Sequence, residues 1–177
     1  MKRFIKSCVT ISALSSLLIA PVLLSAGEAS ALPKRGFDDN YVGGGVSGQV
    51  TNGGQNNDAA NFGGNVQGRV KIDGTPMSAR AKVLWNNDTT CINPEVSADL
   101  GISRGTNIYG AVGYCFVEQD GQSSPLGNND SVTASVGVES QVKKGVVVYS
   151  NATVSFDGFE NNDAMPVNVG GGVGFTF

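Results

Sequence analysis

The sequence predicts an all-β protein, an eight-stranded antiparallel up-and-down transmembrane β-barrel that follows a cleavable signal peptide. Three observations predict this fold. Apolar residues recur at every second position through eight runs of the chain, which is the period of a β-strand. Each run has about ten residues, the length of a tilted strand that crosses a bilayer. Long and short connections alternate between the runs, as they do in outer-membrane barrels.

The predicted signal peptide covers residues 1–31. Lys2, Arg3 and Lys6 give it a positive start, and an apolar stretch and small residues follow, which is the pattern of a cleaved secretory leader. A transmembrane helix is the alternative interpretation, but Pro21 and several hydroxyl side chains interrupt the short apolar stretch. We therefore expect export through a Sec-type pathway.

The rest of the chain divides into a short N-terminal lead at 32–40 and the barrel at 41–177. The predicted strands cover residues 41–50, 61–72, 77–85, 96–103, 107–117, 131–142, 146–156 and 167–177. One set of alternate residues is apolar or small and the other is polar; apolar Val66, for example, stands between Asn65 and Gln67. A soluble barrel or sandwich has the same alternation with its apolar face inward, so the pattern alone leaves both open.

The connections and the aromatic residues favour the membrane barrel. Long connections are expected at residues 51–60, 86–95, 118–130 and 157–166, with short turns between them. Long external loops and tight periplasmic turns are typical of outer-membrane barrels, and an even strand number returns the chain to the periplasmic side. Near the strand ends, aromatic residues fall at the same alternate positions as the apolar residues and so lie on the same face. Aromatic belts at the two membrane interfaces have this arrangement. The expected interface residues are Phe62, Trp85, Tyr114, Phe116 and Phe156 outside and Phe175 on the periplasmic side.

The end of the chain carries a family resemblance. Its last five residues, Val173-Gly174-Phe175-Thr176-Phe177, resemble the closing strand of bacterial outer-membrane barrels. The whole mature chain resembles the small eight-stranded barrels of the opacity-protein and OmpA-like β-barrel type, and its stretches at 61–69 and 110–114 are similar to cyanobacterial members. The resemblance implies that the barrel-insertion machinery reads Phe177 as a C-terminal insertion signal.

The polar faces of the predicted strands point into the lumen. An eight-stranded barrel has an interior just wide enough for its own side chains. The expected lumenal charge cluster consists of Arg69, Lys71, Arg80, Lys82, Asp99 and Glu139. From the short turns, we expect Arg69 to face Arg80 and Lys82 to lie near Asp99. The cluster predicts a mostly plugged lumen; a narrow, anion-preferring pore is the alternative.

The long loops differ from the strands in charge. They hold nine carboxylates, Glu95 among them, and no Lys or Arg. Each loop contains an Asn-Asn-Asp triplet, and the triplets start at Asn56, Asn86, Asn128 and Asn161. Asn and Asp favour turns because they bond their own backbone, which is the simpler interpretation. Binding of a hard cation such as calcium is the alternative, although no EF-hand spacing is present.

The cysteines predict a disulfide. The chain has three cysteines, and cleavage of the signal peptide would remove Cys8. Cys91 and Cys115 remain. They lie on neighbouring parts of the predicted sheet, and both fall at alternate positions that face the lumen. The periplasm is oxidising, so an even pair there favours a disulfide bond over two free thiols.

These observations predict a non-enzymatic envelope protein. The chain has no histidine, which excludes imidazole-dependent catalysis and His-ligated metals, and no cofactor or metal is expected. Its pI near 4.8 argues against nucleic-acid binding. We expect a monomer in the cell outer membrane with a structural or surface-interaction role, and the insertion machinery and membrane lipid as its partners. The alternatives are a narrow low-conductance porin and a secreted soluble β-barrel or adhesin.

Overall fold

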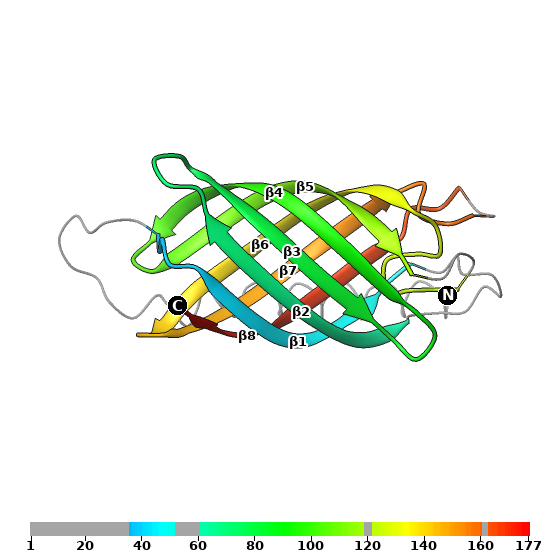
Figure 1. Ribbon diagram of the computed structural model, residues 1–177, viewed down its shortest axis with the longest axis horizontal. Helices are drawn as coiled ribbons and strands as arrows, with labels where there is room; N and C mark the ends of the chain where they lie inside the picture. Colours follow the sequence, from blue (N-terminus) through cyan, green and yellow to red (C-terminus); the bar gives the residue numbers. More distant parts are fainter. Residues whose placement is uncertain (1–35, 52–60, 119–121, 161–162) are drawn as a thin grey trace, which may run out of the picture.

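Eight antiparallel strands close into a β-barrel in the computed structural model of the chain (Figure 1). The structure describes residues 36–51, 61–118, 122–160 and 163–177. The strands are β1 (Tyr41–Gln49), β2 (Phe62–Lys71), β3 (Met77–Trp85), β4 (Thr90–Ser103), β5 (Thr106–Val117), β6 (Ser131–Lys143), β7 (Val146–Phe156) and β8 (Val167–Thr176). Each strand pairs with its neighbours in sequence, and β1 pairs with β8, which confirms the predicted up-and-down barrel.

Two separate findings concern the predicted signal peptide and membrane-spanning helices. The predicted signal peptide at 1–31 and the first residues of the lead lie outside the described residues. Within the described part of the chain, no helix is long and apolar enough to cross a membrane.

The largest difference from the predicted strands is the start of β4. The prediction placed 86–95 in an external loop, which is wrong for residues 90–95, because β4 begins at Thr90 and includes Pro94. Pro94 pairs with Ala81 of β3, whereas the ladder between β4 and β5 passes from Ile92 directly to Glu95. Proline has no backbone N–H to donate, and strand prediction therefore excludes it. Here the neighbouring ladder skips the proline and the strand continues.

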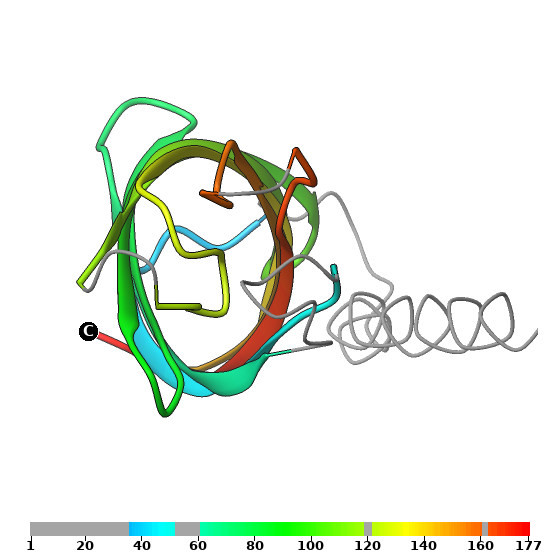
Figure 2. The same ribbon diagram turned by 90° about the vertical axis from the view of Figure 1, so that its right-hand side faces the viewer.

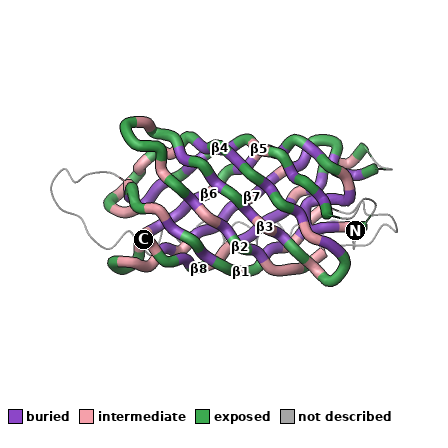
Figure 3. Tube along the Cα trace, in the orientation of Figure 1, coloured by how far each residue is buried: buried purple, intermediate pink, exposed green. Residues whose placement is uncertain are grey.

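The barrel is polar inside and apolar outside. Along the strands, buried and exposed residues alternate (Figure 3). The large exposed apolar side chains include Val42, Val46, Phe62, Val66, Val70, Val96, Leu100, Val112, Val132, Val136 and Val173. The largest buried side chains include Arg69, Lys82, Gln67, Glu139 and Asn93, which is the reverse of a soluble core. This arrangement is the one expected of a barrel whose outer wall contacts hydrocarbon.

A glycine-rich seam closes the barrel between β1 and β8. Gly43 pairs with Gly174, and Gly45 pairs with Gly172, so neither strand contributes a side chain at these positions. A Cβ atom on Gly45 would lie 2.0 Å from the carbonyl oxygen of Gly171 and 2.6 Å from the Cα of Gly172. The two backbones can therefore approach closely only because both carry glycine here.

Candidate functional site

Four charged side chains form a closed ring of ion pairs in the periplasmic half of the lumen. Arg69 of β2 and Arg80 of β3 are direct cross-strand partners. Asp99 accepts from both guanidinium groups at 2.9 Å, and Glu139 lies 3.3 Å from Arg69 and 2.8 Å from Arg80. The side chains of both arginines and of Glu139 are fully buried. Two like charges can stand side by side there because each carboxylate bridges both of them.

Neutral polar groups complete the ring. The Nε–H of Arg69 donates to Ser78 at 3.0 Å, and that of Arg80 donates to Ser97 at 2.8 Å. Tyr41 donates its hydroxyl to Glu139 at 3.0 Å. Ser78, Ser97 and Tyr41 were not predicted as partners, although their lumenal parity was a signal that could have identified them. Buried charges with this many hydrogen bonds are held in one arrangement.

A second ion pair lies one layer further out. Lys82 of β3 contacts Glu95 of β4 at 3.0 Å, and it also donates to Ser135 at 2.9 Å and Thr153 at 3.1 Å. The expectation that Lys82 lies near Asp99 is therefore wrong. It failed because Glu95 was assigned to an external loop, whereas the longer β4 carries it into the lumen.

The described part of the N-terminal lead enters the periplasmic end of the lumen. Phe37 is buried, and its backbone exchanges hydrogen bonds with the side chain of Asn107 at 3.2 and 2.8 Å. The guanidinium carbon of Arg69 lies 4.8 Å from the centre of the Phe37 ring. Lys71 forms an ion pair with Asp38 at the same end. These contacts place residues 36–40 across the inner mouth.

The outer end is covered by residues 122–130, which precede β6. Figure 2, a view along the barrel from the outer end, shows this yellow segment folded over the opening. Leu126 is fully buried. The backbone oxygen of Ser123 accepts from Asn61 at 2.8 Å and from Asn86 at 2.6 Å, and Asn168 donates to Pro125 at 3.0 Å. Residues at the outer ends of β2, β3 and β8, which lie across the mouth from β6, thus hold the segment in place.

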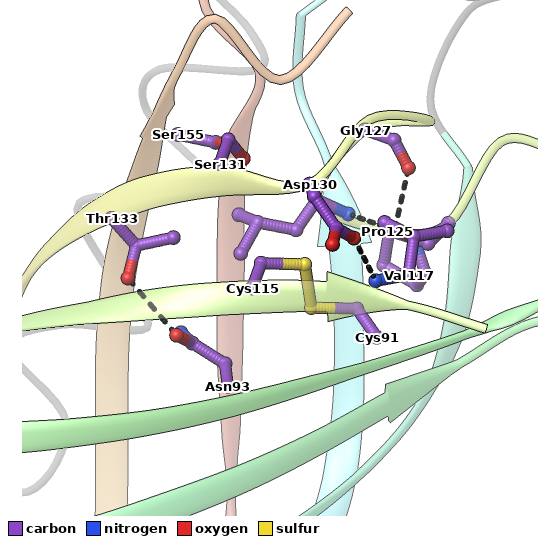
Figure 4. The surroundings of a disulfide bond; sticks show 12 residues. Cys91, Asn93, Cys115, Val117, Pro125, Gly127, Asp130, Ser131, Thr133 and Ser155 are labelled. Atoms are coloured by element: carbon purple, nitrogen blue, oxygen red, sulfur yellow. Dashed lines mark hydrogen bonds between the residues drawn. A yellow bond between two sulfur atoms is a disulfide. The ribbon is translucent and has the colours of Figure 1, made fainter. Parts of the chain in front are cut away.

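A disulfide joins Cys91 of β4 to Cys115 of β5, which confirms the predicted pairing (Figure 4). The Cα atoms are 5.8 Å apart, and both residues are fully buried on the lumenal side. Together with Leu84, Val117 and Leu126 they form an apolar cluster near the outer end of the lumen.

The Asn-Asn-Asp triplets that the structure describes use their side chains for hydrogen bonds, within their own turn at Asn86 and to other segments at 128–130. Asn86 accepts from the backbone N–H groups of Asp88 and Thr89 at 3.0 and 2.9 Å. Asp130 accepts from the N–H of Val117 at 2.7 Å (Figure 4). Among the residues that the structure describes, no three Cys, Asp or Glu side chains gather as a metal site would require. The triplet at 56–58 lies outside the described residues, as do two residues of the last triplet.

The predicted interface aromatics all lie on the outer wall. The exposed set near the outer strand ends is Phe62, Trp85, Tyr114, Phe116 and Phe156. Phe175 and Phe177 are exposed at the opposite end, where the N–H of Phe177 donates to Asn40 at 3.1 Å. The structure places Phe177 next to the closing strand, and its role in insertion stays a prediction.

The chain is similar in structure to solved proteins. No family model matches the chain, and neither does any curated protein sequence. The attachment invasion locus protein Ail of Yersinia pestis matches with 13% identity and a TM-score of 0.54, over 80% of this chain and 100% of Ail. Neisserial surface protein A matches with 15% identity and a TM-score of 0.55, over 78% of this chain and 97% of that protein.

A third match is OprG, an outer-membrane protein of Pseudomonas aeruginosa, with 9% identity and a TM-score of 0.52, over 81% of this chain and 97% of OprG. The similarity to cyanobacterial members stays a prediction. At these identities the likeness concerns the fold, and it agrees with the closed barrel, its strand number and its inverted polarity. The chain has the fold of the small eight-stranded outer-membrane β-barrels.

Proposed function

We propose that this protein is a monomeric, non-enzymatic barrel of the bacterial outer membrane, with a closed lumen and a structural or surface-interaction role. The observation that carries the proposal is the charge balance of the lumen. Three buried cations face three carboxylates, and each is paired: Arg69, Arg80 and Lys82 with Asp99, Glu139 and Glu95. The apolar outer wall and the outer-membrane origin of the structural neighbours support the location.

A closed lumen accounts for the interior better than a narrow porin does. A pore needs a continuous path for water and ions, and selectivity needs groups that are free to contact the ion. Here the guanidinium and ammonium groups already contact carboxylates, and residues 36–40 and 122–130 cover the two ends. An anion would have to displace a buried carboxylate to reach any of these cations.

The outer end fits a positively charged partner. Its connections contain no Lys or Arg, and the described ones expose six carboxylates: Asp88, Glu118, Asp130, Asp157, Glu160 and Asp163. One of the matched structures is Ail in complex with the heparin analogue sucrose octasulfate. The outer end of this chain is negatively charged and would repel such a polyanion. A surface role for this protein therefore involves cationic groups.

Planar-bilayer recording tests the closed lumen. The protein refolded in phospholipid vesicles is expected to give no discrete conductance steps, because the paired side chains fill the interior. Heat-modifiable migration of the same preparation on a gel serves as the control for folding and insertion. Discrete, reproducible steps from correctly inserted protein would replace the closed lumen with the low-conductance porin, and an anion preference would assign them to the arginine ring.

A further inference from the structure

The segment over the outer mouth rests on one apolar surface of the lumen. We call residues 122–130 the lid, and the lumenal side chains of Leu84, Cys91, Cys115 and Val117 the seat. Leu126 is the lid residue that completes the buried cluster with the seat. The disulfide contributes two of the four seat residues. Ser123 and Pro125 of the lid also accept hydrogen bonds from the barrel wall, which water at the barrel mouth can replace.

The disulfide also lies beside an interruption in the sheet. The ladder between β4 and β5 has no pairs at Asn93 and Pro94, and it resumes with Ile92 and Phe116 towards the outer end. Cys91 and Cys115 link the two strands across this interruption. The covalent bond therefore fixes the two strands that carry most of the seat at the point where backbone hydrogen bonds do not.

Buried polar oxygen atoms lie on β1 and β8, next to the contact of the lid at Pro125. Ser47 Oγ, Gln49 Oε1 and Asn168 Oδ1 are buried and have no hydrogen-bond partner in the protein. Gln49 and Asn168 are direct partners on β1 and β8, and the amide nitrogen of Asn168 is already bonded to the lid at Pro125. Buried oxygen atoms without a protein partner gain most from water, so their hydration favours a lid that lifts.

We propose that the lid and the disulfide protect each other, so that the lid lifts only briefly while the Cys91–Cys115 bond is intact and stays open once a small dithiol has reduced that bond. In the step, one S–S bond breaks and two S–H bonds form. The dithiol supplies two electrons and two protons and is itself oxidised to a cyclic disulfide. Because both sulfurs are fully buried under Leu126, the dithiol reaches them only after the lid has lifted.

When the lid opens, water enters the lumen only as far as the buried ion pairs. Lys82 and Glu95 lie below the seat, and the arginine ring lies below them. Reduction therefore hydrates the outer half of the lumen without creating a pore. Failure of this inference is thus distinguishable from failure of the proposed function, because conductance reports on the ion pairs and lid exposure reports on the disulfide.

Hydrogen exchange measured by mass spectrometry tests the lid in the refolded full barrel. We expect the backbone of residues 122–130 to exchange at least about tenfold faster in the Cys91→Ser/Cys115→Ser variant than in the oxidised protein, with β2 and β3 unchanged. Equal exchange in the lid would overturn the proposal. Faster exchange in all strands would overturn it too, because the disulfide would then stabilise the whole fold rather than the lid.

A second measurement uses the intact disulfide and does not depend on the refolding of that variant. The rate at which dithiothreitol reduces the bond is followed by alkylation and mass in the folded protein. Leu126→Ser is expected to raise this rate about tenfold by removing the lid from its seat. Met165→Ser, an exposed outer-loop residue outside the cluster, is the matched control. Equal rates in the wild-type protein and both variants would contradict the protection that the lid is proposed to give.

Discussion

Glu139→Gln is expected to destabilise the folded barrel by about 3–5 kcal/mol, the usual cost of removing one member of a buried ion pair. Glu139 is fully buried and bridges both arginines of the ring. The substitution keeps the shape of the side chain but leaves Arg69 and Arg80 with Asp99 as their shared carboxylate. The free energy of unfolding is measured by urea titration in phospholipid vesicles, followed by the fluorescence of Trp85.

Two comparison variants separate the ring from an unspecific effect. Lys71→Gln removes a partly exposed pair with Asp38 and is expected to cost less than about 1 kcal/mol. Arg80→Met in the Glu139→Gln background removes the excess positive charge, so the double variant is expected to be more stable than Glu139→Gln alone. A Glu139→Gln barrel as stable as the Lys71→Gln barrel would show that the ring does not hold the lumen together.

Gly45→Ala is expected to have the second-largest effect, through the closure of the barrel. The added methyl group would overlap the backbone of Gly171 and Gly172 in β8, and a backbone cannot turn away as a flexible side chain does. Overpacking of this kind costs about 1–3 kcal/mol or more. We expect a lower free energy of unfolding and a smaller folded fraction by heat-modifiable gel mobility.

Gly110→Ala is the matched control for the seam. Gly110 also lies within a strand, but a Cβ atom there would have no neighbour within 4 Å. Its substitution is expected to change the free energy of unfolding by no more than about 0.5 kcal/mol. Equal losses at Gly45 and Gly110 would mean that the close approach of β1 and β8 does not depend on glycine.

The fold could be predicted because its signal is repeated along the whole chain. Alternation at every second residue and the unequal connections each report on all eight strands, so an error in one run does not change the result. The register of Arg69 opposite Arg80 followed from the short turn between β2 and β3 in the same way. The partner of Lys82 did not follow, because it depended on a single strand end that Pro94 obscured.

The two segments that cover the lumen could not be predicted from local patterns. Phe37 contacts Asn107, which is 70 residues away, and Leu126 meets the seat only after the barrel has closed. Contacts between residues so far apart produce no repeating pattern in the sequence. The available signal was weaker: Phe37 and Leu126 are large apolar residues in polar surroundings, and such residues usually find a buried position.

The central claim is that the apolar face of the strands contacts lipid, and the chain's one tryptophan tests it directly. Trp85 lies on the outer wall near the outer end of β3. In vesicles of brominated phospholipid, its fluorescence is expected to be quenched more strongly by bromines near the head group than by bromines deep in the acyl chain. Moving the tryptophan to mid-strand, in Trp85→Phe/Val112→Trp, is expected to reverse that order. Fluorescence that brominated lipid leaves unchanged at both positions, while aqueous iodide quenches it, would contradict the account.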